Sequence, residues 1–217
     1  MSENIQRLRA TYTKGEAVKY ISHLDLARTV ERVFRRARLP LVYSQGFSPR
    51  PKFAFASALP VGATGRAELL DVWLSPPLAP LEFAKRVAPQ LPAGIELVEV
   101  REVDLRLPAL QASVSHADYL VTLEDAPVDL GARIADLLAR DAIPMERQRK
   151  GELRAYDLRP LILELDLIPG PGAQIGMKLA NSSSATGRAD QVLAALGLAD
   201  APYAVERTRL YFDLADQ

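Results

Sequence analysis

The order of predicted secondary structure repeats once along the chain, and this constrains the fold more than any other feature. Alternating apolar residues predict strands and a 3.6-residue period predicts helices. The first half follows the order strand 8–14, helix 23–38, strands 41–44, 52–59 and 67–74, helix 79–91 and strand 95–103. The second half follows with strand 118–124, helix 129–141, strands 144–150, 160–168 and 173–180, helix 185–197 and strand 203–214. The repeat predicts an α+β protein of two tandem ferredoxin-like (βαββαβ) halves, 1–107 and 115–217, with a basic cleft or face.

Several classes of site are excluded by residues that the chain lacks. With no cysteine it forms no disulfide, cysteine nucleophile or cysteine-held cluster. The two histidines, His23 and His116, lie far apart, and no phosphate-binding glycine motif or nucleophile elbow is present. We therefore expect no metal and no cofactor. No apolar run approaches the roughly 18 residues that span a bilayer, and the N-terminus lacks a signal-peptide core, so we expect a cytoplasmic protein without a membrane partner.

Charge is distributed unevenly although the net charge is zero. Residues 1–60 hold eleven Lys and Arg against four Asp and Glu, a net of +7, and residues 61–217 hold sixteen against twenty-three, a net of −7. A basic first segment on an otherwise acidic chain predicts a localised anion-binding surface. The alternative is that the two parts attract each other across an internal interface.

The predicted helix 23–38 separates its charges from its apolar residues. Apolar side chains fall on one side, at Leu26, Ala27, Val30, Val33, Phe34 and Ala37. The other side carries Arg28, Arg32, Arg35 and Arg36, with Ser22 and Asp25 forming an S-x-x-D start signal. Arginines at this spacing repel one another, so the ridge predicts a bound anion or acidic partner. A merely solvated face is the alternative.

The segment 44–62 follows that helix and combines cations, rings and prolines. Pro49 and Pro51 stiffen the backbone beside Arg50 and Lys52, and Gln45 and Phe47 precede them. An exposed ring among cations is the combination that single-stranded nucleic acid prefers. We therefore predict a preordered ligand loop here.

A second basic cluster consists of Arg147, Arg149 and Lys150, followed by Gly151 as a predicted hairpin tip. It extends the ligand surface, or it protects an edge strand from aggregation by its charge. Arg188, in the run 181–191, lies at a predicted helix start, which suits a phosphate or simply an N-cap.

The run YISHLDLARTVERVFRRARLPLVYSQGFSPRPKFAFASALPVG, residues 20–62, resembles the hallmark segment of the radical-SAM-linked proteins, an uncharacterised bacterial family with a domain of unknown function. The likeness continues more loosely through GRAELLDVWL and RKGELRAYDLRPLI to RADQVLAALG. It implies association with a radical-SAM partner and a role in RNA metabolism. Without cluster cysteines the chain does not perform radical-SAM chemistry alone. In outline it is also similar to the tandem ferredoxin-like endoribonucleases that process CRISPR repeats.

Three functions therefore stay open. The first is a non-catalytic RNA-binding or adaptor protein that works with a radical-SAM enzyme. The second is a metal-independent endoribonuclease in which His23 and Tyr20 are the catalytic candidates, since a histidine beside phosphate acts as acid or base. The third is an accessory domain that binds only protein. For His23, a capping or packing role is the alternative to catalysis.

Overall fold

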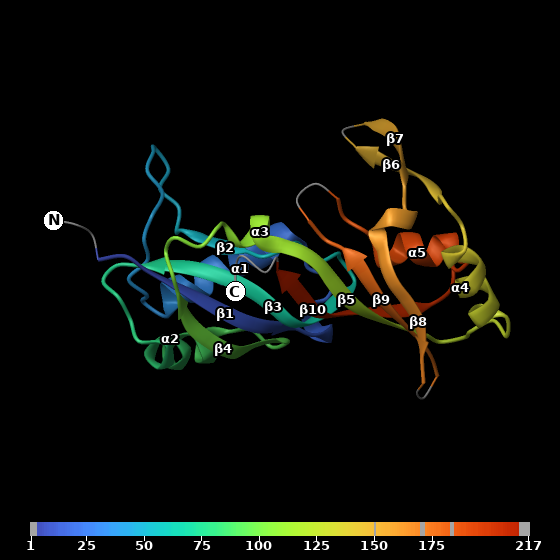
Figure 1. The fold of residues 1–217 in the computed structure, drawn as a ribbon. Coiled ribbons are helices and arrows are strands. Elements are labelled where there is room, and N and C mark those ends of the chain that lie inside the picture. Colours follow the sequence, from blue (N-terminus) through green and yellow to red (C-terminus); the bar gives the residue numbers. More distant parts are fainter. Residues whose placement is uncertain (1–3, 150, 170–171, 183–184, 213–217) are drawn as a thin grey trace. The chain divides into compact units, whose positions relative to one another are not determined.

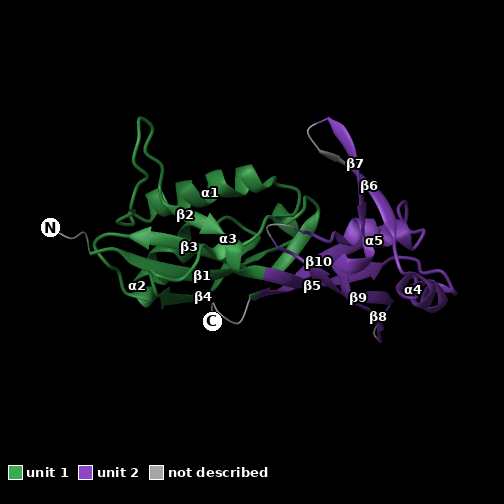
Figure 2. Ribbon diagram, turned by 45° about the horizontal axis from the view of Figure 1, so that its top comes forward, with its two compact units in different colours: residues 1–114, 212–217 green, residues 115–211 purple. Residues whose placement is uncertain are grey.

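The computed structural model describes residues 4–149, 151–169, 172–182 and 185–212, and the chain divides into two compact units (Figure 2). The first unit comprises residues 1–114 and 212–217, and the second comprises residues 115–211. No helix in the described part of the chain is long and apolar enough to cross a membrane.

The first unit is an antiparallel sheet with helices packed against it. Its elements are β1 (Gln6–Lys14), α1 (His23–Arg36), β2 (Phe53–Phe55), β3 (Ala63–Leu74), α2 (Pro80–Val87), β4 (Ile95–Val103) and the short α3 (Leu110–Ser113) (Figure 1). The strands lie in the order β4-β1-β3-β2, and each neighbouring pair is antiparallel. Single 3₁₀ turns occupy Glu16–Val18 and Ala88–Gln90.

The second unit repeats this succession and adds a hairpin. Its elements are β5 (Val114–Leu123), α4 (Leu130–Leu138), β6 (Pro144–Arg149), β7 (Glu152–Asp157), a 3₁₀ turn (Arg159–Leu161), β8 (Ile162–Ile168), β9 (Ala173–Ala180), α5 (Ala189–Ala195) and β10 (Tyr203–Phe212). The main strands lie in the order β10-β5-β9-β8, while β6 and β7 pair only with each other among the described strands. The predicted α+β class is confirmed.

Two predicted strands of the first half are shorter than the pattern suggested. In 41–44 only Leu41 and Tyr43 form isolated bridges, to Leu74 and Pro51, and of 52–59 only Phe53–Phe55 is a strand. Prolines at 40, 49, 51 and 60 flank these segments. Proline has no N–H to donate to a sheet ladder, so pairing is interrupted there.

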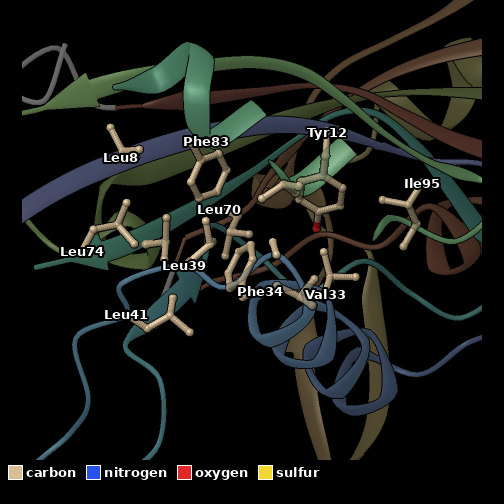
Figure 3. Close-up of a cluster of buried hydrophobic side chains, with 14 of the residues drawn as sticks. Leu8, Tyr12, Val33, Phe34, Leu39, Leu41, Leu70, Leu74, Phe83 and Ile95 are labelled. Atoms are coloured by element: carbon tan, nitrogen blue, oxygen red, sulfur yellow. The ribbon is translucent and has the colours of Figure 1, made fainter. Parts of the chain in front are cut away.

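Alternate residues of the strands build the core of the first unit. Leu8 and Tyr12 on β1 and Leu70 and Leu74 on β3 face the helices, because side chains two residues apart point to the same side of a sheet (Figure 3). From α1 and α2 the core receives Leu26, Val30, Val33, Phe34, Phe83 and Val87. The rings of Phe34 and Phe83 meet edge to face, with centroids 5.9 Å apart.

The opposite face of the same strands buries charge. Asp71 on β3 has no exposed surface, and the guanidinium groups of Arg7 and Arg9 on β1 donate hydrogen bonds to its carboxylate. Arg7 also donates to the carbonyl oxygens of Leu107 and Pro108, at 2.8 and 2.9 Å. Arg7, held by the buried carboxylate of Asp71, thereby links the connector after β4 to the sheet.

Candidate ligand-binding surface

The ridge on α1 begins with the helix cap that the sequence predicts. The Ser22 hydroxyl accepts a hydrogen bond from the backbone N–H of Asp25 at 3.1 Å, which satisfies one of the free donors at the helix start. The helix ends at Arg36, two residues earlier than predicted, and Arg38 has a left-handed backbone with φ 51°. The apolar stripe is buried and the arginines face outward.

Ion pairs within the helix neutralise part of this ridge. Arg35 pairs with Glu31 at 2.7 Å, and Arg28 pairs with Asp25 at 3.3 Å. Arg28 and Arg35 therefore repel their neighbours less than their spacing alone suggests, since carboxylates lie three or four residues away on the same face. Arg32 and Arg36 are exposed and form no ion pair within 4.0 Å among the described residues. These two carry the free positive charge of the helix.

Residues 42–52 form a projecting segment that we call the first arm. Figure 1 shows it as the blue loop that extends away from the strands between α1 and β2. The backbone N–H of Ser44 donates to the carbonyl of Arg50 at 2.8 Å, and the N–H of Arg50 donates back to the Ser44 hydroxyl at 3.0 Å. At the base of the arm, the backbone N–H of Lys52 donates to the carbonyl oxygen of Val42 at 2.7 Å. The arm is thus internally hydrogen-bonded rather than open.

The tip of the first arm presents an apolar ring to solvent. Phe47 has a relative exposure of 110%, and Gly46 before it has φ +138°, a conformation that favours glycine. Gln45 and Arg50 are exposed as well. Lys52 is exposed, but its ammonium lies 4.7 Å from the centre of the Trp73 ring, so this cation is held at the base.

The first arm and the catalytic candidates lie at opposite ends of α1. The Phe53 ring, next to the arm, meets Phe34 at 5.8 Å, whereas Phe55 meets His23 at 5.1 Å. The helix has 14 residues and is about 21 Å long at about 1.5 Å per residue. His23 therefore packs at the start of the helix, where Tyr20 is 73% exposed, and the arm stands beside its other end.

The second basic cluster lies on a hairpin of the second unit. We call residues 144–157, which include β6 and β7, the second arm; β6 and β7 are labelled in Figures 1 and 2. Its register runs from Pro144↔Asp157 to Arg149↔Glu152, and Gly151 at the turn has φ +86°. Arg147 is exposed, with its guanidinium 5.3 Å from the centre of the Tyr156 ring. Lys150 and the side chain of Arg149 lie outside the described residues.

Some contacts were not visible in the sequence because they join distant strands. Trp73 lies under Lys52 and Tyr156 lies under Arg147. In the sequence, the patterns around these two rings indicate only strands. In the second unit the Tyr211 hydroxyl donates to Asp118 at 2.7 Å, and this hydrogen bond raises the pKa of Tyr211. The His116 ring stacks on Tyr211 with centroids 4.4 Å apart. No sequence motif marks this cluster.

Other predicted binding positions are already engaged. The guanidinium of Arg188 donates two hydrogen bonds to Asp190, at 2.9 and 2.8 Å, and this contact raises the pKa of Arg188. A phosphate would have to compete with that carboxylate. Within the described ranges, no three His, Asp or Glu side chains gather as a metal site would require.

Comparison with solved structures gives remote likenesses. A Cbf5–Nop10–Gar1 complex matches at 12% identity with a TM-score of 0.47, covering 95% of this chain and 49% of that chain. An archaeal box H/ACA sRNP Nop10–Cbf5 complex matches at 11% identity with a TM-score of 0.44, covering 94% and 47%. A putative glycine cleavage system transcriptional repressor matches at 10% identity with a TM-score of 0.28, covering 96% and 99%. The chain thus spans about half the length of the first two structures.

Comparison with known sequences and sequence families assigns the chain to a family. No curated protein matches it. Residues 7–189 match a family of uncharacterized proteins conserved in bacteria, DUF2344. The match begins within β1 and ends at the start of α5, so it includes α1 and both arms. Because it extends over most of the chain, this protein belongs to the DUF2344 family of uncharacterized proteins conserved in bacteria.

Proposed function

We propose that this protein binds RNA without cleaving it, through the outward face of α1 and the first arm, and serves as an adaptor for a radical-SAM enzyme. One observation carries the proposal. Two exposed arginines without an ion-pair partner among the described residues, Arg32 and Arg36, stand beside an internally hydrogen-bonded arm that keeps Phe47 in solvent. On such a surface the arginines can bind RNA phosphates, and the Phe47 ring can stack on a base.

The cations supply attraction that does not depend on sequence. Each phosphate neutralised by Lys or Arg releases counterions, so affinity falls as salt rises. Arg32 and Arg36 suit this role because phosphate does not have to displace a carboxylate from them. Arg28 and Arg35 have to exchange Asp25 or Glu31 for phosphate, which reduces their contribution.

Phe47 supplies the contact to a base. Stacking on an aromatic side chain contributes about 1–3 kcal/mol per base and tolerates any base. The arm's own hydrogen bonds fix the backbone before binding, so little conformational entropy is lost when the ring docks. A duplex hides its base faces, so this contact favours single-stranded RNA.

The position of His23 favours binding over cleavage. His23 and Tyr20 lie at the start of α1, about 20 Å from the arm at the helix's other end by the length of the helix. The imidazole therefore does not act on a phosphate held near Arg36 and the arm. The endoribonuclease remains the second candidate because Tyr20 is exposed beside His23's end of the helix.

The adaptor role rests on the resemblance of residues 20–62 to radical-SAM-linked proteins, and a cytoplasmic location accompanies it. Co-expression with a radical-SAM enzyme encoded in the same genome, followed by size-exclusion chromatography, should give a shared peak. Separate elution at micromolar concentrations would contradict the adaptor role and leave RNA binding standing.

We also propose that each unit is one ferredoxin-like half. The order β4-β1-β3-β2 in the first unit and β10-β5-β9-β8 in the second support this, because a βαββαβ chain with antiparallel neighbours has the order 4-1-3-2. An experimental structure with another strand order in either unit would contradict it.

A salt titration tests RNA binding. The affinity for an unstructured RNA of about 20 nucleotides, measured by fluorescence anisotropy between about 50 and 200 mM salt, should fall steeply. Arg32→Ala and Arg36→Ala should each reduce the slope of log K against log salt by about 0.7–1. Phe47→Ala should leave the slope unchanged and weaken binding by about 1–3 kcal/mol.

Lys85→Ala is the matched control, because Lys85 is an exposed cation on α2 of the same unit. It should change neither slope nor affinity. All variants should melt within a few degrees of the parent, since their side chains are exposed. Binding without salt dependence, or equal slopes in all variants, would refute the proposal, and cleaved RNA in a metal chelator would favour the endoribonuclease.

A further inference from the structure

The two arms occupy the same place in the two units. The first arm lies between α1 and β2, after the first helix of its unit and before the second strand of its sheet. The second arm lies between α4 and β8, again after the first helix and before the second main strand. The repeated element order already puts 41–44 and 144–150 at the same step, but the two arms differ in form, because one is a loop with two prolines and the other is a regular hairpin.

Both arms are closed at the base by a backbone hydrogen bond between their two sides. In the first, Leu41 and Pro51 are buried at the base, and the backbone N–H of Lys52 donates to the carbonyl of Val42 at 2.7 Å. In the second, Ile143 and Leu158 are buried at the base, and the N–H of Leu158 donates to Ile143 at 2.9 Å. Each arm therefore leaves its unit as two chain segments that are hydrogen-bonded to each other at the base.

A cation lies over an aromatic ring in each arm. Lys52 lies 4.7 Å from the centre of Trp73, and Arg147 lies 5.3 Å from the centre of Tyr156. This contact holds the positive charge in one position while leaving it exposed. A phosphate then meets a cation that is already oriented.

Both arms are net positive and both expose an apolar side chain. Residues 42–52 hold two cations and no carboxylate, a net of +2, and residues 144–157 hold four cations and three carboxylates, a net of +1. Leu153 in the second arm is 70% exposed, as the apolar counterpart of Phe47. Arg154 pairs with Glu152 at 3.3 Å, whereas Arg147 has no ion-pair partner among the described residues.

We propose that the second arm is a second RNA contact equivalent to the first, so that one chain binds one long RNA at two places. This inference rests on the proposed function. Once one arm is bound, the other meets the same RNA at a high effective concentration, and the combined affinity exceeds that of either arm by a large factor. Leu153 offers apolar contact without stacking, so the second arm depends more on Arg147.

Stoichiometry separates the two contacts. An RNA of about 6 nucleotides, within the site size of a single contact, should bind the full chain at two molecules per chain in calorimetry. An RNA of about 40 nucleotides should bind at one per chain and at least about tenfold more tightly. Arg147→Ala with Leu153→Ala should reduce the short-RNA stoichiometry to one, as should Phe47→Ala with Arg50→Ala. Either double variant should lose at least about tenfold in affinity for the long RNA.

Matched controls in the second unit are Arg140→Ala and Val128→Ala, which remove an exposed cation and an exposed apolar side chain outside the arm. Both should behave as the parent. A stoichiometry of one for the short RNA, unchanged by the second-arm variant while salt-dependent binding persists, would overturn the inference alone and leave the second arm as a charge-protected hairpin. Absence of binding to either RNA would overturn the proposed function as well.

Discussion

At the residue scale, Asp71 is the position whose loss should cost most. Its buried carboxylate accepts hydrogen bonds from Arg7 and Arg9, which are themselves buried. Asp71→Asn keeps the shape but leaves two buried guanidinium groups without a negative partner, and breaking a buried ion pair costs about 3–5 kcal/mol. The melting temperature should fall by about 10 °C or more for a chain of this size. Asp104→Asn is the control, because its pair with Arg106 is exposed and contributes little. Equal melting temperatures for the two variants would show that the carboxylate at 71 is not needed.

At the scale of an element, the stability of α1 depends on its cap as well as on its apolar face. The Ser22 hydroxyl accepts from the N–H of Asp25 and donates to its carboxylate at 2.7 Å. Ser22→Ala removes both contacts and should destabilise the protein by about 1 kcal/mol, measured by urea unfolding. Ser22→Asn, which also caps helices, should recover most of that loss. If the asparagine variant is as unstable as the alanine variant, the hydroxyl stabilises something other than the helix start.

At the scale of the whole molecule, the shifted pKa values predict how stability depends on pH. The side-chain and backbone hydrogen bonds with Arg106 lower the pKa of Asp104 from 3.8 to about 2, and Arg133 lowers the pKa of Asp129. A lowered pKa contributes stability above the unfolded value that is lost as pH falls through the folded value. Ion pairs with Glu16 and Glu164 raise the pKa of Lys19 and Lys178 above 10.5, so their contribution is lost only above that pH. From these groups the melting temperature should be flat between about pH 5 and 9 and should fall between about pH 4 and 2. Because the pair of Asp104 with Arg106 is exposed, the difference in melting temperature between the parent and Asp104→Asn should be small at neutral pH and should disappear by about pH 2; a difference that grows as pH falls would contradict the assignment.

Short-range features of the sequence determined most of the elements. The alternation of IELVEVREV and AQIGMKLA predicted β4 and β9 with their observed bounds, and the cap at Ser22 predicted the start of α1. Such features involve residues a few positions apart, so the chain carries them locally. The exposure of Phe47 was also predicted, because this ring lies outside the alternating pattern that turns Phe53 and Phe55 toward the core.

Only the tertiary structure decided which distant residues meet. Arg9 and Asp71 are 62 positions apart, and nothing local in the strand 8–14 distinguishes a buried arginine from a solvated one. The tertiary structure also placed His23 and the first arm at opposite ends of α1 and held Lys52 over Trp73. These outcomes depend on strand register and on the packing of helix against sheet. Sequence pattern determines which residues face the core, but pairing between strands determines which side chains become neighbours.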